Sequence, residues 1–170
     1  MKIIFCFSLV IGWLVMLLVP SISNAKEMTL ATGMKKADIS KDFNLTEYGR
    51  TLTGPAETMS SYKIVSKENI AFSIAIDDDE LIHRIYTNDK SFKLPNGIGI
   101  GSSFADIKKE YSNYEIEWYQ GLGRFVEIDD NVTFWFKLRL DNDYTIIENE
   151  EIIVEIEFKN IALEAAGSSR

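Results

Sequence analysis

The chain has very little of the chemistry on which most enzymes and metal sites depend. It contains one cysteine, Cys6, and one histidine, His83. Cys6 lies inside an apolar N-terminal run, so no thiol and no disulfide remain once that run is removed. His83 has no cysteine and no second histidine with which to complete a zinc site or a nucleophile–base pair. These absences exclude disulfide scaffolds and thiol enzymes and give His83 no predicted catalytic role.

Positive charge is also scarce. Lysine and arginine number 18 against 26 aspartates and glutamates, a net charge of −8. Such a surface repels nucleic acid and suits a cationic partner, although solubility alone would explain the same charge. Gly97, Gly99 and Gly101 alternate without the lysine of a phosphate-binding loop, and no other motif indicates a cofactor. We expect no cofactor and no nucleic-acid partner.

The first 25 residues read as a secretion signal. Lys2 is followed by an uncharged apolar run from Ile3 to Val19, Pro20 breaks the run, and small residues precede Ala25. Cleavage after Ala25 predicts a periplasmic or secreted protein with no stable membrane insertion. The alternative is a retained anchor, for which the apolar run is at the short end of what spans a bilayer.

The most informative positive feature is a phrase that occurs twice. Gly33-Met-Lys-Lys-Ala-Asp-Ile-Ser-Lys-Asp-Phe43 returns as Gly101-Ser-Ser-Phe-Ala-Asp-Ile-Lys-Lys-Glu-Tyr111. The similarity extends downstream, where Ile70–Ile76 is matched with Val132–Leu138, and 78–85 with 149–156. A phrase repeated at long spacing indicates a structural unit used twice.

Each copy is expected to begin with a helix and continue as a meander of strands. The apolar spacing predicts a first helix over 34–44 and a second opening at Ser103, where Asp106 would complete a capping box. A turn-rich break is expected over 49–55, and a weakly helical tail after Asn160. Alternating apolar residues predict strands at 61–66, 69–76, 80–87, 114–119, 124–128, 132–140 and 152–158.

These elements predict an α+β fold. Two tandem helix-plus-antiparallel-meander units would form a largely continuous antiparallel sheet with the helices on one face. The expected divisions are a signal peptide at 1–25, a first unit at 26–90, a second at 91–160 and a flexible tail at 161–170. Chance similarity of two periodic segments is the alternative explanation of the repeat.

The Gly33-Met34-Lys35 start with Ile39 a turn later, followed by a Gly-Pro loop and a meander, resembles the β-lactamase-inhibitor-protein-like superfamily. That superfamily includes the SmpA/OmlA-type envelope-assembly lipoproteins. The second copy matches at Gly101 and Ile107 but lacks the methionine. The resemblance implies a non-enzymatic binding fold that grips another protein. The disulfides of the inhibitors and the lipidated cysteine of the lipoproteins have no counterpart here, so no contact residue is carried over.

Acidic clusters at 77–80, 129–131 and 141–143 raise the question of a hard cation. The last begins like a calcium loop, but Ile146 stands where that loop needs glycine and Ile152 where it needs glutamate. All three clusters fall between predicted strands, where Asp and Asn favour turns. We therefore interpret them as turns and predict no metal site.

Aromatic residues of the second copy are the best candidates for binding. In alternating strands Trp135 faces away from Phe134 and Phe136, and Trp118 and Tyr119 face opposite ways. Exposed Trp, Tyr and Arg often anchor protein interfaces, although large aromatics are as often buried. The predicted contact residues are Trp118, Tyr119, Trp135 and Arg124.

The sequence thus predicts an exported, non-enzymatic protein-binding module, most simply an inhibitor or immunity-like protein for an envelope or secreted enzyme. A cell-envelope assembly or scaffold component is one alternative. A small hydrolase that uses carboxylates alone is another, and it requires two carboxyl groups to converge in a pocket with one pKa strongly shifted.

Overall fold

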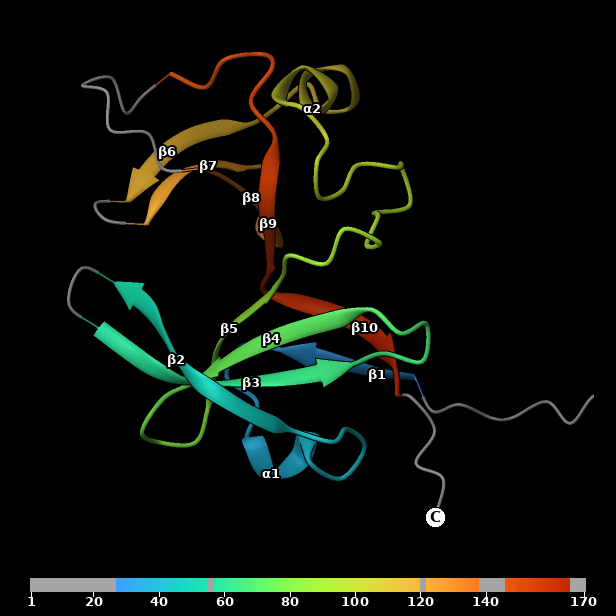
Figure 1. Cartoon of the computed structure of the whole chain (residues 1–170), viewed down its shortest axis with the longest axis vertical. Coiled ribbons are helices and arrows are strands. Elements are labelled where there is room, and N and C mark those ends of the chain that lie inside the picture. The colour runs from blue at the N-terminus through green and yellow to red at the C-terminus, as the bar shows by residue number, and fades with distance from the viewer. Residues whose placement is uncertain (1–26, 55–56, 120–121, 138–145, 166–170) are drawn as a thin grey trace, which may run out of the picture.

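The computed structural model describes residues 27–54, 57–119, 122–137 and 146–165. Within these ranges the chain forms ten strands and two short helices, and no helix there is long and apolar enough to cross a membrane (Figure 1). In chain order the elements are β1 (Glu27–Ala31), α1 (Lys36–Ile39), β2 (Thr46–Gly54), β3 (Glu57–Val65), β4 (Ala71–Ile76), β5 (Ile82–Thr87), α2 (Phe104–Glu110), β6 (Glu115–Tyr119), β7 (Gly123–Glu127), β8 (Val132–Phe136), β9 (Ile153–Phe158) and β10 (Asn160–Glu164).

Eight strands form one antiparallel sheet in the order β2-β3-β4-β5-β9-β8-β7-β6, and β1 pairs with β10 in a separate two-stranded sheet. Read inward from either edge, each half of the large sheet is a run of four consecutive strands that follows one helix. Figure 1 shows these halves one above the other, with α2 near β6–β9 and α1 below β3. They join at the seam between β5 and β9, which holds the pairs Ile85–Phe158, Tyr86–Glu157 and Thr87–Ile156.

One apolar core extends through both halves. Ile39 of α1 and Phe104 of α2 belong to the same buried cluster as the inward side chains of the sheet. The Phe104 ring meets the Phe136 ring edge-on, with centroids 5.9 Å apart. Leu30 of β1 and Leu163 of β10 add the small sheet to this cluster. Full burial of each such side chain contributes about 1.5–3 kcal/mol, so the helices are held by their apolar faces rather than by their length.

The two copies of the repeated phrase make matching contacts. The Gly33 N–H donates to the Ile82 carbonyl at 2.7 Å, and the Gly101 N–H donates to the Ile153 carbonyl at 2.9 Å. Both glycines have positive φ, 83° and 86°, a conformation that other residues rarely adopt. Each phrase is therefore tied in the same way to the last strand of its own half.

A bulge interrupts β5 and β9 at equivalent places. His83 and Val154 are the extra residues, because the pairing passes from Ala75–Arg84 to Ile76–Ile82 in one half and from Trp135–Glu155 to Phe136–Ile153 in the other. The predicted match of 78–85 with 149–156 aligns His83 with Val154. The predicted match of Ile70–Ile76 with Val132–Leu138 is wrong by two residues, since the bulges align Ala75 with Trp135.

The predicted α+β class is wrong, and the protein has a largely β fold. The two helices have 4 and 7 residues, whereas ten strands fill most of the described chain. The helix predicted over 34–44 is reduced to Lys36–Ile39, and Lys35 at its N-cap supplies no side-chain hydrogen bond. Ile39 packs from α1 as predicted, whereas Phe43 packs from the bend that follows the helix.

Two further predictions are corrected. The turn-rich break over 49–55 is replaced by β2 up to Gly54, with Gly49 absorbed at a bulge where φ is 145°. The weakly helical tail after Asn160 is replaced by β10, whose backbone pairs with β1. Propensity is a weak guide in both places because sheet pairing with distant strands decides the conformation.

Candidate functional site

Strand register sorts the side chains of the large sheet onto two faces. The core face packs under α2, and the opposite face is open. On the open face Tyr86 lies beside Glu157 across the seam, and Trp135 lies between Phe125 and Glu155 on its neighbouring strands. The aromatic side chains and the glutamates of these strands therefore lie together on one surface.

This surface is hollowed. Two adjoining hollows share Arg84, Leu122 and Trp135, and together they are called the groove. The β2-side hollow, about 420 Å³, is also lined by Arg50, Thr51, Leu52, Phe136, Val154 and Glu155. The β7-side hollow, about 250 Å³, is also lined by His83, Tyr119, Phe125, Glu127, Thr133, Glu157 and Lys159.

Apolar side chains stand exposed around the groove. Leu52 is 47% exposed, Tyr119 43% and Val154 37%, and all three line it. Val154 points outward because the β9 bulge turns it away from the core. Exposed apolar side chains gathered around one concavity are typical of an interaction site.

Arg84 forms the centre of the groove floor. Its Nε donates to Glu157 Oε2 at 2.7 Å, and its Nη2 donates to Glu155 Oε1 at 2.6 Å. The guanidinium carbon lies 4.8 Å from the Tyr86 ring centroid and 5.0 Å from that of Trp135. The Trp135 indole N–H also donates to Glu157 Oε2, at 2.8 Å. The floor is thus a connected network that spans β5, β8 and β9.

Burial and the contacts within the network shift the pKa values of Glu155, Arg84 and Tyr86. Burial raises the pKa of Glu155, and the Arg84 charge offsets this only in part. Burial also opposes the charge of Arg84, but Glu155 and Glu157 outweigh it and hold the Arg84 pKa above its ordinary value. Burial and the hydrogen bond with Tyr48 raise the pKa of Tyr86. Arg84 remains charged, and its guanidinium forms ion pairs with both Glu155 and Glu157.

The structure brings two of the four predicted contact residues together. Trp135 and Tyr119 both line the β7-side hollow. Trp118 is 46% exposed but lies opposite Arg124 on the other face of the sheet, away from the groove. As expected, Trp118 and Tyr119 face opposite ways.

Arg124 is not a surface residue. It is 2% exposed, and its guanidinium holds Glu151 through two hydrogen bonds and also donates to the Ile146 carbonyl. These contacts fasten the segment before β9 to β7. Its burial in these contacts gives Arg124 a structural role in place of the predicted contact role.

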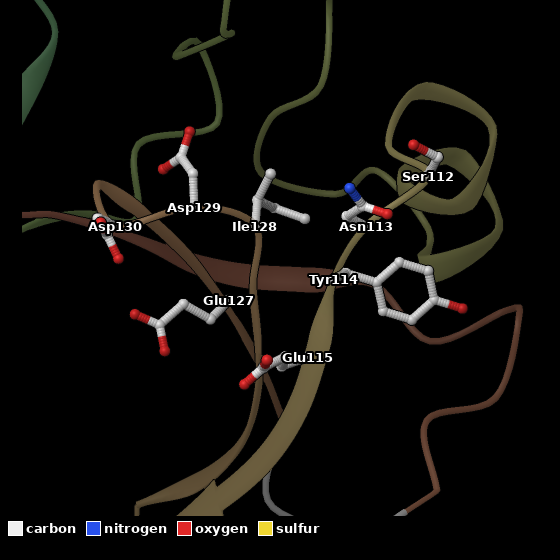
Figure 2. Close-up of a pocket in the computed structure, with 8 residues that line it drawn as sticks. All are labelled: Ser112, Asn113, Tyr114, Glu115, Glu127, Ile128, Asp129 and Asp130. Atoms are coloured by element: carbon white, nitrogen blue, oxygen red, sulfur yellow. The ribbon is translucent and has the colours of Figure 1, made fainter.

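A third hollow, of about 640 Å³, lies outside the groove at the outer edge of the sheet and is acidic. Figure 2 shows Glu115 and Glu127 on adjacent strands with Asp129 and Asp130 in the turn beyond them. Within the described residues no group of three or more His, Cys, Asp or Glu side chains could hold a metal ion. This hollow is therefore an acidic surface and not a candidate metal site.

The acidic turns behave as predicted where they can be seen. Asp77 Oδ1 accepts the N–H of Asp79 at 3.0 Å and of Leu81 at 2.9 Å. Asp129 Oδ1 accepts the N–H of Asn131 at 2.7 Å. Both carboxylates close turns, which confirms the interpretation of these two clusters. The cluster at 141–143 and the calcium-loop comparison over it lie outside the described residues, as does the predicted signal peptide.

Sequence reasoning missed Arg84, Glu155 and Glu157. Each stands in an apolar strand pattern at a position that alternation assigns to the open face. The repeat contained a usable signal, since the match of 78–85 with 149–156 places Arg84 opposite Glu155 in the alignment. In the structure these two equivalent positions form an ion pair across the seam.

No family model and no curated protein matches the chain. Among solved structures, the uncharacterized protein yfeY from Escherichia coli is similar, with a TM-score of 0.46 and 16% identity over 76% of this chain and 90% of that chain. A likeness at this level carries no argument about the fold or the function of this chain.

Proposed function

We propose that this chain is a non-enzymatic protein-binding module that holds its partner in the groove. The observation that carries the proposal is the exposed apolar margin of Leu52, Tyr119 and Val154 around the floor of Arg84 and Trp135. A protein interface typically has an aromatic and arginine centre that is already held in place before binding. The Arg84 network supplies such a centre.

The class of partner follows from the sequence. An N-terminal segment typical of export, a net charge of −8 and the resemblance to inhibitor-type binding proteins all favour an inhibitor or immunity-like protein for an envelope or secreted enzyme. The groove is open, and Arg84 engages Glu155 and Glu157 on its floor, which supports binding over catalysis.

The proposal is tested with a partner and matched variants. Tagged protein is used to recover a stoichiometric partner from the envelope and secreted fractions of the source cells. The affinity of the purified partner is then measured calorimetrically for Leu52→Asp and Tyr119→Asp, with Ile152→Asp as the control on an exposed side chain outside the groove. We expect the two groove variants to weaken binding by about tenfold or more, because they place charge in a desolvated contact.

An unchanged affinity for both groove variants, or no stoichiometric partner at all for a folded protein, would count against the proposal. The control separates loss of binding from a general effect of added charge.

One observation favours a second candidate, a carboxylate-based hydrolase. Glu155 and Glu157 converge in the groove, and the pKa of Glu155 is raised by burial, as a general acid requires. Assays of the wild type and Glu155→Gln on peptidoglycan and on chromogenic glycosides separate the two candidates. The binding proposal predicts no turnover by either protein, whereas the hydrolase requires activity that Glu155→Gln abolishes.

A further inference from the structure

We propose that the β7-side hollow binds an arginine side chain of the partner protein. This inference rests on the proposed function and adds the chemistry that the partner presents. It follows from three properties of the hollow, namely aromatic faces, available carboxylate oxygens and the surrounding charge.

Of the aromatic rings in this hollow, that of Trp135 already accepts a guanidinium. The Trp135 and Phe125 rings lie 4.7 Å apart at a 36° tilt, and Tyr119 is 43% exposed beside them. The guanidinium of Arg84 rests 5.0 Å from the Trp135 centroid. Ring faces attract cations, and arginine more often than lysine, because its planar head can also stack.

Two carboxylates of the hollow can accept further hydrogen bonds. Arg84 and Trp135 both donate to Oε2 of Glu157, and within the described residues Oε1 of that carboxylate has no hydrogen-bond partner. Glu127 has its nearest cation, Lys159, at 3.8 Å, which is longer than a strong charged hydrogen bond. An incoming guanidinium has several N–H donors with which to reach both.

The surrounding charge favours a cation. Arg84 is balanced by Glu155 and Glu157, and Lys159 is balanced by Glu127. The neighbouring strand β6 adds Glu117 beside Phe125 and Glu115 beside Glu127 on the same face. The open face around the hollow is therefore net negative, like the whole chain, and it disfavours a carboxylate or a phosphate.

The test uses a matched pair of small probes, Nα-acetyl-arginine amide and its neutral counterpart Nα-acetyl-citrulline amide. Both are titrated into ¹⁵N-labelled protein while the indole N–H resonance of Trp135 is followed by NMR, with Trp135→Phe used for assignment. We expect a saturable shift with arginine and about tenfold weaker binding of citrulline, because citrulline keeps the shape and loses the charge. Glu127→Gln should reduce this preference, and Glu110→Gln on α2 should not.

Equal responses to the two probes, a response that spares Trp135, or no saturable response would each overturn the arginine site. Equal responses to Nα-acetyl-lysine amide and to the arginine probe would overturn the choice of arginine. A partner recovered through the groove together with a negative probe result would retain the proposed function and reject only this inference. A positive probe result without any partner would retain the arginine site and count against the proposed function.

Discussion

At the scale of the residue, one side chain decides how well each helix begins. Ser103 accepts the Asp106 N–H, and the Asp106 carboxylate accepts the Ser103 N–H at 2.9 Å, so that α2 starts with a complete capping box. The equivalent residue before α1 is Lys35, which supplies no side-chain cap. Asp38 nevertheless stands at the position that corresponds to Asp106, so half of the device is present in the first copy.

Exchange of the cap residues should therefore move stability in opposite directions. We expect Ser103→Ala to lower the free energy of unfolding by about 1 kcal/mol, because it leaves helix N–H groups without an acceptor. Lys35→Ser should raise it by about 0.5–1 kcal/mol by completing the box with Asp38. Urea unfolding measures both, and stabilisation by Ser103→Ala would contradict the account.

Asp89 should make stability depend on acid pH. Its carboxylate accepts the Ser91 hydroxyl at 2.6 Å and the N–H groups of Ser91 and Ala71, and these bonds lower its pKa from 3.8 to about 2. A depressed pKa in the folded state contributes stability that is present above pH 4 and lost as pH falls toward 2. The melting temperature of Asp89→Asn should approach that of the wild type over this range. A constant difference at every pH would assign the effect to shape alone.

At the scale of the element, the weakest joint in the large sheet is its seam. Three residue pairs join β5 to β9, and Arg84 reinforces them by binding two carboxylates of β9. Because Arg84 is 8% exposed, its removal leaves partly buried negative charges without a counterion.

We expect Arg84→Met to lower the free energy of unfolding by about 3 kcal/mol, measured in urea, whereas Arg50→Met on exposed β2 should change it by about 0.5 kcal/mol or less. The double variant Arg84→Met with Glu155→Gln should recover part of the loss. Additive effects of the two changes would show that the pair is not coupled.

Strand positions could be predicted from the sequence wherever alternation was strong, as in β4, β5 and β9. Helix length could not, because Phe43 is buried from the bend after α1 as effectively as it would be from a longer helix. The residue types of the groove were only partly predictable. Trp135 and Tyr119 were found from alternation, whereas Arg84 depends on the pairing of β5 with β9, which joins residues far apart in the chain. Local pattern contains no information about that contact.

At the scale of the whole molecule, the two ends of the described chain are fastened together. β1 pairs with β10, and Lys67 donates to Glu164 at 2.7 Å beside them. Leu163 is 6% exposed in the core beneath this small sheet. The C-terminal strand thus stabilises the first half of the fold and not only the second.

We expect Leu163→Ala to lower the free energy of unfolding by about 3 kcal/mol through the cavity that it leaves, whereas Thr29→Ala on the exposed side of β1 should cost about 0.5 kcal/mol or less. Hydrogen exchange should report the loss in β1 as well as in β10. Loss of protection confined to residues after Asn160 would show that Leu163 does not stabilise β1 through its pairing with β10.

The seam has one more consequence. The pair Tyr86–Glu157 lies on the pseudo-twofold axis that relates the two halves, and Arg84 and Glu155 are equivalent positions on either side of it. In a symmetric dimer of one half, each of these positions would meet its own copy, and like charges would face one another. Fusion of both halves into a single polypeptide removes that restriction. The two halves can then carry different residues at the axis, so that one side of the seam is cationic at Arg84 and the other is anionic at Glu155.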